Sequence, residues 1–279
     1  MTTPSSTAIS TTPSYNASLE IYRENASARI FRIFPDGPRL RYAPGQYGSL
    51  GLLSKRHPDK LIKRAYSLSS SIVDLASRQL LASDDLNYYE VYINRFESAD
   101  RDIERLTPQL FELSSGARIF CGTKIVGHYS LGGVNPTKNV LLLGTTTGES
   151  PNNAISHQVL SEARPIRIAN VAIGSAQFGS IPWRSLYEPE HAFLMDTYPQ
   201  YRYLPITTPT PADYRPFEQL LRTWLEKPQT AEQQLGFVLT PDNAHVFLCG
   251  DPQLIGAPKK LGGWNYEYPD HGVFRLLTQ

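Results

Sequence analysis

The feature that most constrains the fold is a change of hydrophobic rhythm near Asn135-Pro136. Before this point the apolar residues come in short runs typical of strands, such as residues 28–34, separated by turn sequences. After it, continuous apolar strands alternate with helical segments. One uniform sheet or one helical bundle cannot satisfy both patterns. We therefore expect two domains, which cover residues 17–135 and 136–279.

The first half predicts a closed antiparallel β-barrel, because it holds five or six short strands and a single helix. In residues 88–94 the side chains of Tyr89, Val91 and Ile93 alternate with those of Tyr88, Glu90 and Tyr92, which indicates a half-buried strand. The helix should begin with Thr107 as its N-cap and Pro108 at its first position. The expected strands cover residues 28–34, 46–52, 65–69, 88–94 and 118–125.

The second half predicts a doubly wound parallel sheet. Strands are expected over residues 140–144, 166–173 and 245–250. A helix should start at Ser150-Pro151, where Ser at the N-cap and Pro at the next position are preferred. An amphipathic helix is expected over residues 213–227, since its apolar side chains recur at helical spacing: Phe217, Leu220, Leu221, Trp224 and Leu225.

Composition excludes several classes of function. The 279 residues carry 27 Lys and Arg against 26 Asp and Glu, a net charge of +1, which argues against a nucleic-acid partner. No apolar run approaches the roughly 18 residues that a membrane-spanning helix needs, and no signal peptide is visible. The six histidines and two cysteines lack the spacing of a metal site. We expect a cytoplasmic protein with a flexible Ser-, Thr- and Pro-rich tail over residues 1–16.

A first candidate site is Arg64-Ala65-Tyr66-Ser67, which follows Pro44-Gly45-Gln46-Tyr47 along the chain. On a strand, Arg64 and Tyr66 share one face. A cation beside an aromatic ring can hold a phosphate while the ring stacks on a flat heterocycle. An ordinary edge strand is the alternative interpretation.

A second candidate is the segment 144–151, which joins a buried strand to a helix N-terminus, the usual place for a nucleotide phosphate. A simple glycine-containing turn is the alternative. Gly148-Glu149-Ser150-Pro151-Asn152 is close to a hydrolase nucleophile elbow, but Pro151 lacks the N–H that an oxyanion hole requires.

A third candidate is Cys249-Gly250, where a thiol at a strand end could lie against a flat ligand or simply pack in the core.

Taken together and in order, these segments resemble the ferredoxin–NADP reductase family, most closely its bacterial flavodoxin/ferredoxin reductase branch. The resemblance covers about residues 18–256. The motifs that carry it occur in the family's order: Pro44-Gly45-Gln46-Tyr47, Leu50-Gly51-Leu52, Arg64-Ala65-Tyr66-Ser67, Leu106-Thr107, Gly127-His128-Tyr129, residues 144–151 and Cys249-Gly250-Asp251-Pro252.

The resemblance implies an FAD site in the barrel. Arg64 would bind the FAD pyrophosphate, Tyr66 would stack on the isoalloxazine, and Ser67 would hydrogen-bond near N5. The other residues implied to contact FAD are Ala65, Val91, Tyr92 and Thr107.

In the α/β half the resemblance implies a dinucleotide site. Thr145, Thr147 and Gly148 would line the pyrophosphate and nicotinamide, and Cys249, followed by Gly250, would lie beside the nicotinamide C4. Ser67 and Cys249 are the implied catalytic residues. Thr208 stands where the family commonly has a Ser-Arg pair for the NADP 2′-phosphate.

The implied activity is hydride transfer between NADPH and FAD, followed by exchange of single electrons with ferredoxin or flavodoxin; NAD(H) is the alternative coenzyme. Such carriers are acidic in this family and need a basic dock. A positive stretch near the expected flavin edge could supply it, or could be a solvated loop: Lys55, Arg56, His57, Lys60, Lys63 and Arg64.

The sequence departs from the family in its dinucleotide loop, where Thr146 replaces the central glycine of Gly-Thr-Gly-Thr-Gly. A β-branched residue is costly there if the backbone needs a positive φ. The 2′-phosphate Arg is also missing, with Arg215 as a substitute, and Ser175 replaces another Arg. Two alternatives therefore stay open: an NADH-preferring flavin reductase or oxygenase reductase component, and a binding protein with an impaired dinucleotide site.

Overall fold

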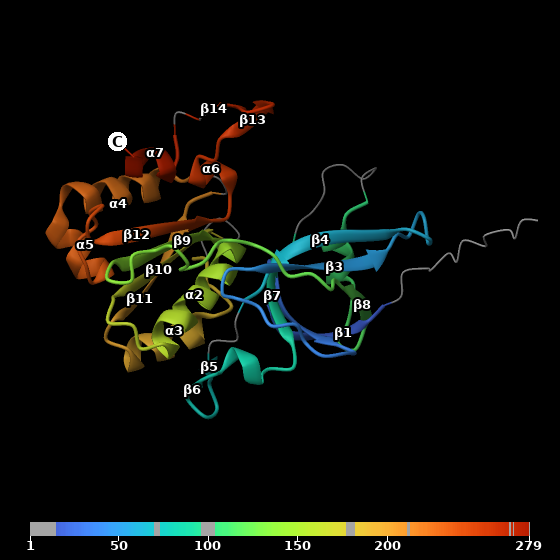
Figure 1. Cartoon of the computed structure of the whole chain (residues 1–279). Coiled ribbons are helices and arrows are strands. Elements are labelled where there is room, and N and C mark those ends of the chain that lie inside the picture. Colours follow the sequence, from blue (N-terminus) through green and yellow to red (C-terminus); the bar gives the residue numbers. More distant parts are fainter. Residues whose placement is uncertain are drawn as a thin grey trace, which may run out of the picture.

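The computed structural model describes residues 15–69, 73–95, 104–176, 182–210, 213–267, 269 and 271–278. Figure 1 shows an antiparallel barrel beside an α/β layer, the fold class expected from the sequence. Residues 1–14 of the expected tail lie outside the described residues. Residues 15 and 16, the last two of the expected tail, belong to the barrel, because Asn16 donates its backbone N–H to the Ile119 carbonyl at 3.1 Å.

The barrel is a six-stranded antiparallel sheet with the strand order β4-β3-β8-β1-β2-β7. A bridge closes it where the Ser69 N–H donates to the Glu90 carbonyl at 2.8 Å, between the chain that follows β4 and strand β7. The strands are β1 (Ala17–Glu24), β2 (Ala28–Pro35), β3 (Tyr47–Leu53), β4 (Leu61–Ser67), β7 (Tyr89–Asn94) and β8 (Arg118–Cys121). Closure leaves few unpaired edges, which is how small all-β layers avoid edge pairing.

Helix α1 (Leu106–Phe111) packs Leu106 and Leu110 into the barrel core. The expectation that Thr107 caps it is wrong. Arg105 is the N-cap and makes no side-chain cap bond, and Thr107 lies inside the first turn. Its hydroxyl is instead 3.0 Å from the Tyr66 hydroxyl, a partner that only the tertiary structure supplies.

The α/β layer is a four-stranded parallel sheet with the order β11-β10-β9-β12. One face is covered by α2 and α3, and the other by α4, α5, α6 and α7 (Figure 1). The strands are β9 (Asn139–Thr145), β10 (Ile168–Ser175), β11 (Tyr201–Thr208) and β12 (Ala244–Cys249). The helices are α2 (Glu149–Ser161), α3 (Glu188–Thr197), α4 (Arg215–Glu226), α5 (Pro228–Leu235), α6 (Pro252–Ile255) and α7 (Val273–Thr278).

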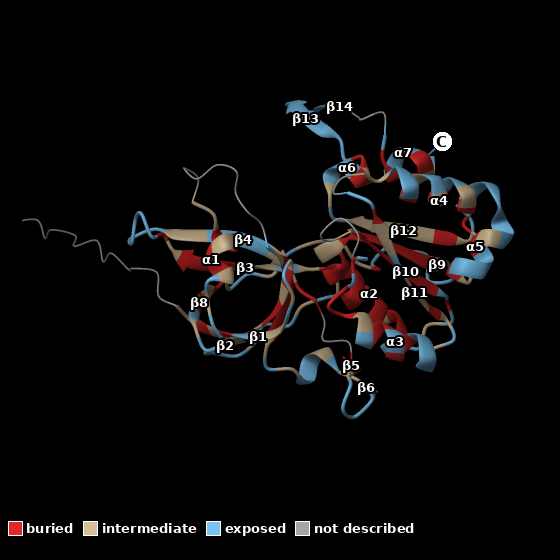
Figure 2. Cartoon of the chain, turned by 180° about the vertical axis from the view of Figure 1, so that it is seen from behind, coloured by how far each residue is buried: buried red, intermediate tan, exposed pale blue. Residues whose placement is uncertain are grey.

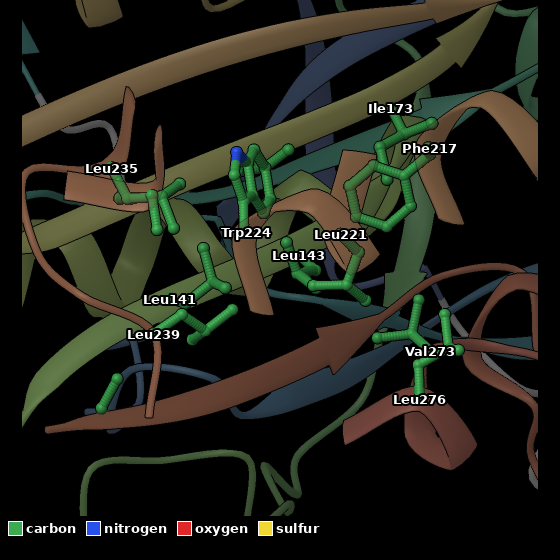
Figure 3. Packing of buried hydrophobic residues seen from close by; sticks show 14 of the residues in the cluster. Leu141, Leu143, Ile173, Phe217, Leu221, Trp224, Leu235, Leu239, Val273 and Leu276 are labelled. Carbon is green, nitrogen blue, oxygen red and sulfur yellow. The ribbon is translucent and has the colours of Figure 1, made fainter. Parts of the chain in front are cut away.

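The predicted amphipathic helix is confirmed as α4. Phe217, Leu221 and Trp224 are fully buried against strands β9 and β10 (Figure 3), whereas Leu225 is 36% exposed. Trp224 packs edge-on against Phe217 and donates its indole N–H to Gln234 Oε1 at 2.7 Å. The buried apolar stripe therefore fixes α4, and with it the loop that precedes it, to the sheet.

Strand β7 differs from its expectation of one buried face, because both of its faces are buried. On the outer face Tyr92 packs edge-on against Tyr187, and Glu90 accepts hydrogen bonds from Arg32 (3.1 Å) and the Tyr187 hydroxyl (2.9 Å). Tyr187 directly precedes α3, so the face that should meet solvent meets the α/β layer instead.

Several elements carry no clear periodic signal. Edge strand β11 contains Pro205, which an edge position tolerates and a central one does not. The remaining short elements are the hairpins β5 (Val73–Asp74) with β6 (Gln79–Leu80) and β13 (Lys259–Gly262) with β14 (Asn265–Glu267), and the 3₁₀ turns η1 (Ser83–Asp85) and η2 (Thr146–Gly148). Figure 2 shows the β13–β14 hairpin as exposed, apart from the buried core. Among the described residues, no helix is long and apolar enough to cross a membrane.

Trp224→Ala should lower the free energy of unfolding by about 3–5 kcal/mol, since it empties a fully buried aromatic site. Urea unfolding monitored by circular dichroism measures this change. Leu225→Ala, one residue along the same helix, should cost less than about 1 kcal/mol because that side chain is partly exposed. Equal losses in the two variants would contradict the burial pattern of α4.

Candidate functional site

A cavity of about 430 Å³ lies where the barrel meets the α/β layer, and we call it the seam cavity. It combines the carboxyl ends of β4 and β7 and the start of α1 with the loops that follow β9 and β12. Its lining residues are Arg64, Ala65, Tyr66, Ser67, Tyr92, Ile93, Asn94, Arg105, Thr107, Thr147, Gly148, Ser150, Cys249 and Gly250. Ten of these residues are among those that the resemblance implies for the FAD and dinucleotide sites.

The barrel side of the seam cavity presents a cation and an aromatic ring. Arg64 is exposed and has no ion-pair partner among the described residues. Burial raises the pKa of Tyr66, against the opposing effects of its hydrogen bond with Thr107 and of the charge of Arg64, so its hydroxyl is neutral at physiological pH. The hydrogen bond between β4 and α1 thus holds the Tyr66 ring in place. Next to it, the Arg64 guanidinium is available to an anion.

The α/β side brings backbone into close contact through two glycines. A Cβ on Gly148 would lie 2.3 Å from the Cys249 carbonyl oxygen, and one on Gly250 would lie 2.0 Å from Thr145 Oγ1. Gly250 also has a φ of +129°, which disfavours any residue with a side chain. The loops after β9 and β12 therefore come so close together that only glycine fits at positions 148 and 250.

Cys249 lies in this wall as a neutral thiol. Burial raises its pKa to about 11, so it carries no thiolate at physiological pH. It is unpaired, as is Cys121. A small, polarizable and uncharged group of this kind suits contact with a flat ring rather than nucleophilic attack.

A second cavity, of about 420 Å³, lies at the carboxyl ends of the parallel strands, and we call it the sheet-edge cavity. The strand order reverses between β9 and β12, and parallel sheets bind ligands at such a switch point. Its lining residues are Thr145, Thr146, Thr147, Ile173, Gly174, Ser175, Thr208, Tyr214, Gly250 and Asp251. Thr147 and Gly250 line both cavities, so the two adjoin.

Thr146 adopts a φ of +45°, the left-handed conformation in which a β-branched residue is strained. Such a conformation costs on the order of 1–3 kcal/mol. Asn94, at the end of β7, donates its side-chain amide to Thr146 Oγ1 at 2.6 Å. A hydrogen bond from the barrel thus holds the strained residue of the α/β loop in place.

Ser150 also differs from its predicted role as N-cap. Helix α2 begins two residues earlier, with Gly148 as its N-cap, and the Ser150 hydroxyl donates to the Ser67 carbonyl at 3.1 Å. The neighbouring Glu149 is fully buried, with its carboxylate 2.5 Å from both Ser185 Oγ and His191 Nε2. The start of α2 is therefore tied both to β4 and to the chain around α3.

Three groups of residues with an expected site role line neither cavity. Val91 points into the barrel core, because adjacent strand residues face opposite sides and Tyr92 takes the cavity side. Arg215 is an exposed side chain paired with Asp213. The basic turn, residues 55–60, lies at the end of β3 and β4 remote from the α/β layer (Figure 1), and Lys60 is about 23 Å from Ser67 at 3.3 Å per strand residue.

Among the lining residues to which the sequence analysis gave no site role are Asn94, Arg105, Tyr214 and Asp251. Asp251 had a usable signal, since an Asp before Pro252 is a good helix cap. The other three have no local pattern, because their role depends on which element lies opposite. Within the described ranges, no three metal-binding side chains cluster together.

Comparison with known proteins gives a match in structure only. No family model matches the sequence. Curated proteins give no match either.

Solved structures match over most of the chain. A ferredoxin NADP⁺ reductase from Neisseria gonorrhoeae with bound FAD and NADP is 20% identical, with a TM-score of 0.63 and 87% of each chain covered. A variant ferredoxin-NADP⁺ reductase from Plasmodium falciparum is 13% identical, with a TM-score of 0.58 and 85% of each chain covered. The cytochrome b5 reductase domain of Ulva prolifera nitrate reductase is 15% identical, with a TM-score of 0.56 over 85% of this chain and 87% of that one.

The TM-scores of 0.56 to 0.63 over most of the chain show that these structures share the two-layer fold described above. At such low identity the likeness concerns the fold and not the individual residues. The chain has the fold of the ferredoxin–NADP reductases and of the related reductases that bind FAD and NAD(P).

Proposed function

We propose that the protein is an FAD-dependent oxidoreductase that moves hydride between a nicotinamide dinucleotide, NADPH or NADH, and FAD, and exchanges single electrons with ferredoxin or flavodoxin. The observation that carries this proposal is the seam cavity, where Arg64, Tyr66 and Ser67 of β4 meet Gly148 and Cys249 of the α/β layer. Residues 17–135 would hold FAD and residues 136–279 the dinucleotide.

The residues of the seam cavity fit a flavin nucleotide. Its volume is within the range of about 300–1,000 Å³ that is usual for ligand sites. Arg64 offers a guanidinium for a pyrophosphate, and Tyr66 offers a ring whose hydroxyl is already satisfied by Thr107. The glycine contacts at Gly148 and Gly250 leave a wall of backbone against which a flat ring can lie.

Each side chain has a distinct proposed role. FAD, when bound, would supply the step between two-electron and one-electron chemistry. Arg64 and Thr107 would bind its phosphates, Tyr66 would stack on the ring system, and Ser67 would hydrogen-bond near N5. Cys249 would pack beside the nicotinamide, and Tyr92 would contact the ribose and adenine side.

The sheet-edge cavity fits a dinucleotide. The first turn of α2 offers backbone N–H groups to a pyrophosphate beside Gly148, and Thr145, Thr147 and Thr208 offer hydroxyls. Because this cavity adjoins the seam cavity at Thr147 and Gly250, a molecule that spans both would bring its nicotinamide end to the flavin.

A second candidate is a flavin reductase or an oxygenase reductase component with a different acceptor. The remote position of the basic turn favours it, because an acidic carrier docked on residues 55–60 would be held far from the seam cavity. For either candidate, the unpaired Cys121 and Cys249 support a reducing compartment such as the cytoplasm.

The visible absorption spectrum of the purified protein tests the proposal. We expect a yellow protein whose flavin absorbance bleaches when NADPH or NADH is added without oxygen. A protein that stays colourless after incubation with FAD would contradict the flavin site. A yellow protein that neither dinucleotide reduces would instead favour a binding role.

Tyr66→Ala should reduce the amount of FAD that stays bound during gel filtration at least tenfold, because the ring that stacks on the flavin is gone. Tyr66→Phe keeps the ring and loses only the hydroxyl, so it should keep most of its FAD. Equal FAD content in wild type and Tyr66→Ala would count against stacking.

Thr146→Gly should tighten dinucleotide binding about fivefold, since glycine adopts a positive φ without strain and lets a phosphate come closer. Isothermal titration calorimetry measures the Kd. Thr146→Ala loses the same hydrogen bond from Asn94 but keeps the Cβ, so it should gain much less. No difference between Gly and Ala would mean that the Cβ of Thr146 is harmless.

Lys63→Glu should lower electron transfer to ferredoxin at least about threefold while leaving reduction of a small dye unchanged, because Lys63 is exposed on β4 and lies nearer than the basic turn to the end of that strand at the seam cavity. Lys60→Glu reverses the same charge in the remote turn and should have little effect. If Lys60→Glu has the larger effect, the carrier docks on the turn after all.

A further inference from the structure

The hairpin of β13 and β14 presents a large apolar side chain at its turn. Gly262 pairs with Asn265, so Gly263 and Trp264 form a two-residue loop. Gly263 has a φ of +56°, and a positive φ at the first loop position is what such a tight turn requires. The local sequence therefore places Trp264 at the far end of the hairpin.

Three apolar side chains of this hairpin are exposed, and we call them together the hairpin tip: Leu261, Trp264 and Tyr266. Trp264 is 90% exposed and Leu261 is 61% exposed. Every residue of β13 and β14 is exposed as well (Figure 2). An isolated two-stranded hairpin is marginally stable in water unless it packs against another element. Exposed apolar side chains gathered on one element mark an interaction site, so we expect a surface that covers the tip.

An apolar groove of about 260 Å³ lies on the same chain beside β12, an edge strand of the parallel sheet, and we call it the edge groove. Val246 and Leu248 of β12 line it on the face that carries α4 and α7. Parallel sheets normally have both faces covered by helices, and the edge groove is a gap in this cover. Among the described residues that line it, only Thr240 and Thr278 are polar.

Two large side chains of the edge groove are partly in water. Phe274 of α7 is 47% exposed, and Leu225 of α4 is exposed to a lesser degree. An apolar occupant would cover both of them. No residue of the hairpin tip or of the edge groove lines the seam cavity or the sheet-edge cavity. The two surfaces are therefore separate from the proposed flavin and dinucleotide sites.

The hairpin tip and the edge groove lie on the same side of the α/β layer. The hairpin connects α6 to α7, and the groove lies between α4, α7 and β12 (Figure 1). Within one copy the tip does not fill the groove, because Trp264 is almost wholly exposed. A two-fold axis on this side would place the tip of each copy in the groove of the other and so form two identical contacts.

The area of such a pair of contacts is that of a stable dimer. Each tip would bury about 400 Å², and the groove that receives it about as much. Two contacts would thus bury roughly 1,600 Å², and specific interfaces bury about 1,200–2,000 Å².

We propose that the protein forms a two-fold symmetric homodimer in which Trp264 of each copy inserts into the edge groove of the other. A second copy is the occupant because the chain itself carries both the apolar tip and an apolar groove able to hold an indole ring. This inference does not depend on the proposed function, since neither surface belongs to the two cavities.

Sedimentation velocity of the purified full chain, over a hundredfold range of concentration, tests the proposal. We expect the mass to rise from that of one chain to that of two. Trp183 and Trp224 are buried, so the exposed Trp264 should account for a blue shift of the fluorescence as the dimer forms. A chain that stays monomeric at the highest concentration would overturn the proposal. So would a dimer whose formation leaves the emission unshifted.

Trp264→Ser removes the centre of the tip and should raise the Kd of the dimer at least about tenfold. The melting temperature of the monomer should stay unchanged, because the indole lies in water in a single copy. A dimer of wild-type affinity in this variant would rule out the hairpin as the contact.

Phe274→Glu places a charge in the edge groove and should weaken the dimer by a similar factor. Met195→Glu is the matched control, since Met195 is an exposed apolar residue of α3, on the other face of the sheet. It should dimerise like the wild type. If Phe274→Glu melts at a lower temperature, Leu225→Glu tests the opposite wall of the groove. Wild-type affinity in a groove variant that melts normally would contradict the proposal.

Mixing Trp264→Ser with Phe274→Glu tests the pairing of tip and groove directly. In the mixed dimer the intact tip of one variant meets the intact groove of the other, so one of the two contacts is restored. We expect the mixture to associate more tightly than either variant alone. A mixture that associates no better would show that the tip does not bind the groove.

Discussion

The structure depends on buried polar contacts across the seam between the barrel and the α/β layer. Arg23 of β1 binds the buried Glu190 of α3 with two contacts of 2.8 Å, and the Tyr187 hydroxyl donates to the buried Glu90 of β7. A buried carboxylate without such partners would cost several kcal/mol. Because each layer satisfies groups of the other, their relative position is fixed, and so is the cavity between them.

That fixed seam explains how the two cavities can act together. The loops after β9 and β12 come within contact of each other only because Gly148 and Gly250 lack side chains. Asn94 holds the strained Thr146 from the barrel side, so the loop that would bind a dinucleotide is set by the layer that would bind the flavin. Alignment of a hydride donor and acceptor needs this kind of rigidity, since small displacements lower the rate steeply.

Local patterns predicted the fold class and most of the seam cavity. The β4 motif from Arg64 to Ser67 and the end of β12 at Cys249 could be found because alternation and strand ends are readable in a single segment. Strand β7 was harder, since the face of Tyr92 that looks exposed in the sequence packs against Tyr187. Thr107 showed the same limit, because its partner Tyr66 is 41 residues away.

The sequence by itself determined the order of the layers, the amphipathic face of α4 and the departure at Thr146, because periodicity and residue chemistry are properties of neighbours along the chain. Only the tertiary structure decided that Thr146 has a positive φ, that the basic turn is remote from the cavity, and that the Asp251 carboxylate accepts a hydrogen bond from the Tyr214 hydroxyl. These facts depend on which strand ends meet at one edge, and contacts between segments far apart in sequence leave no periodic trace in either one.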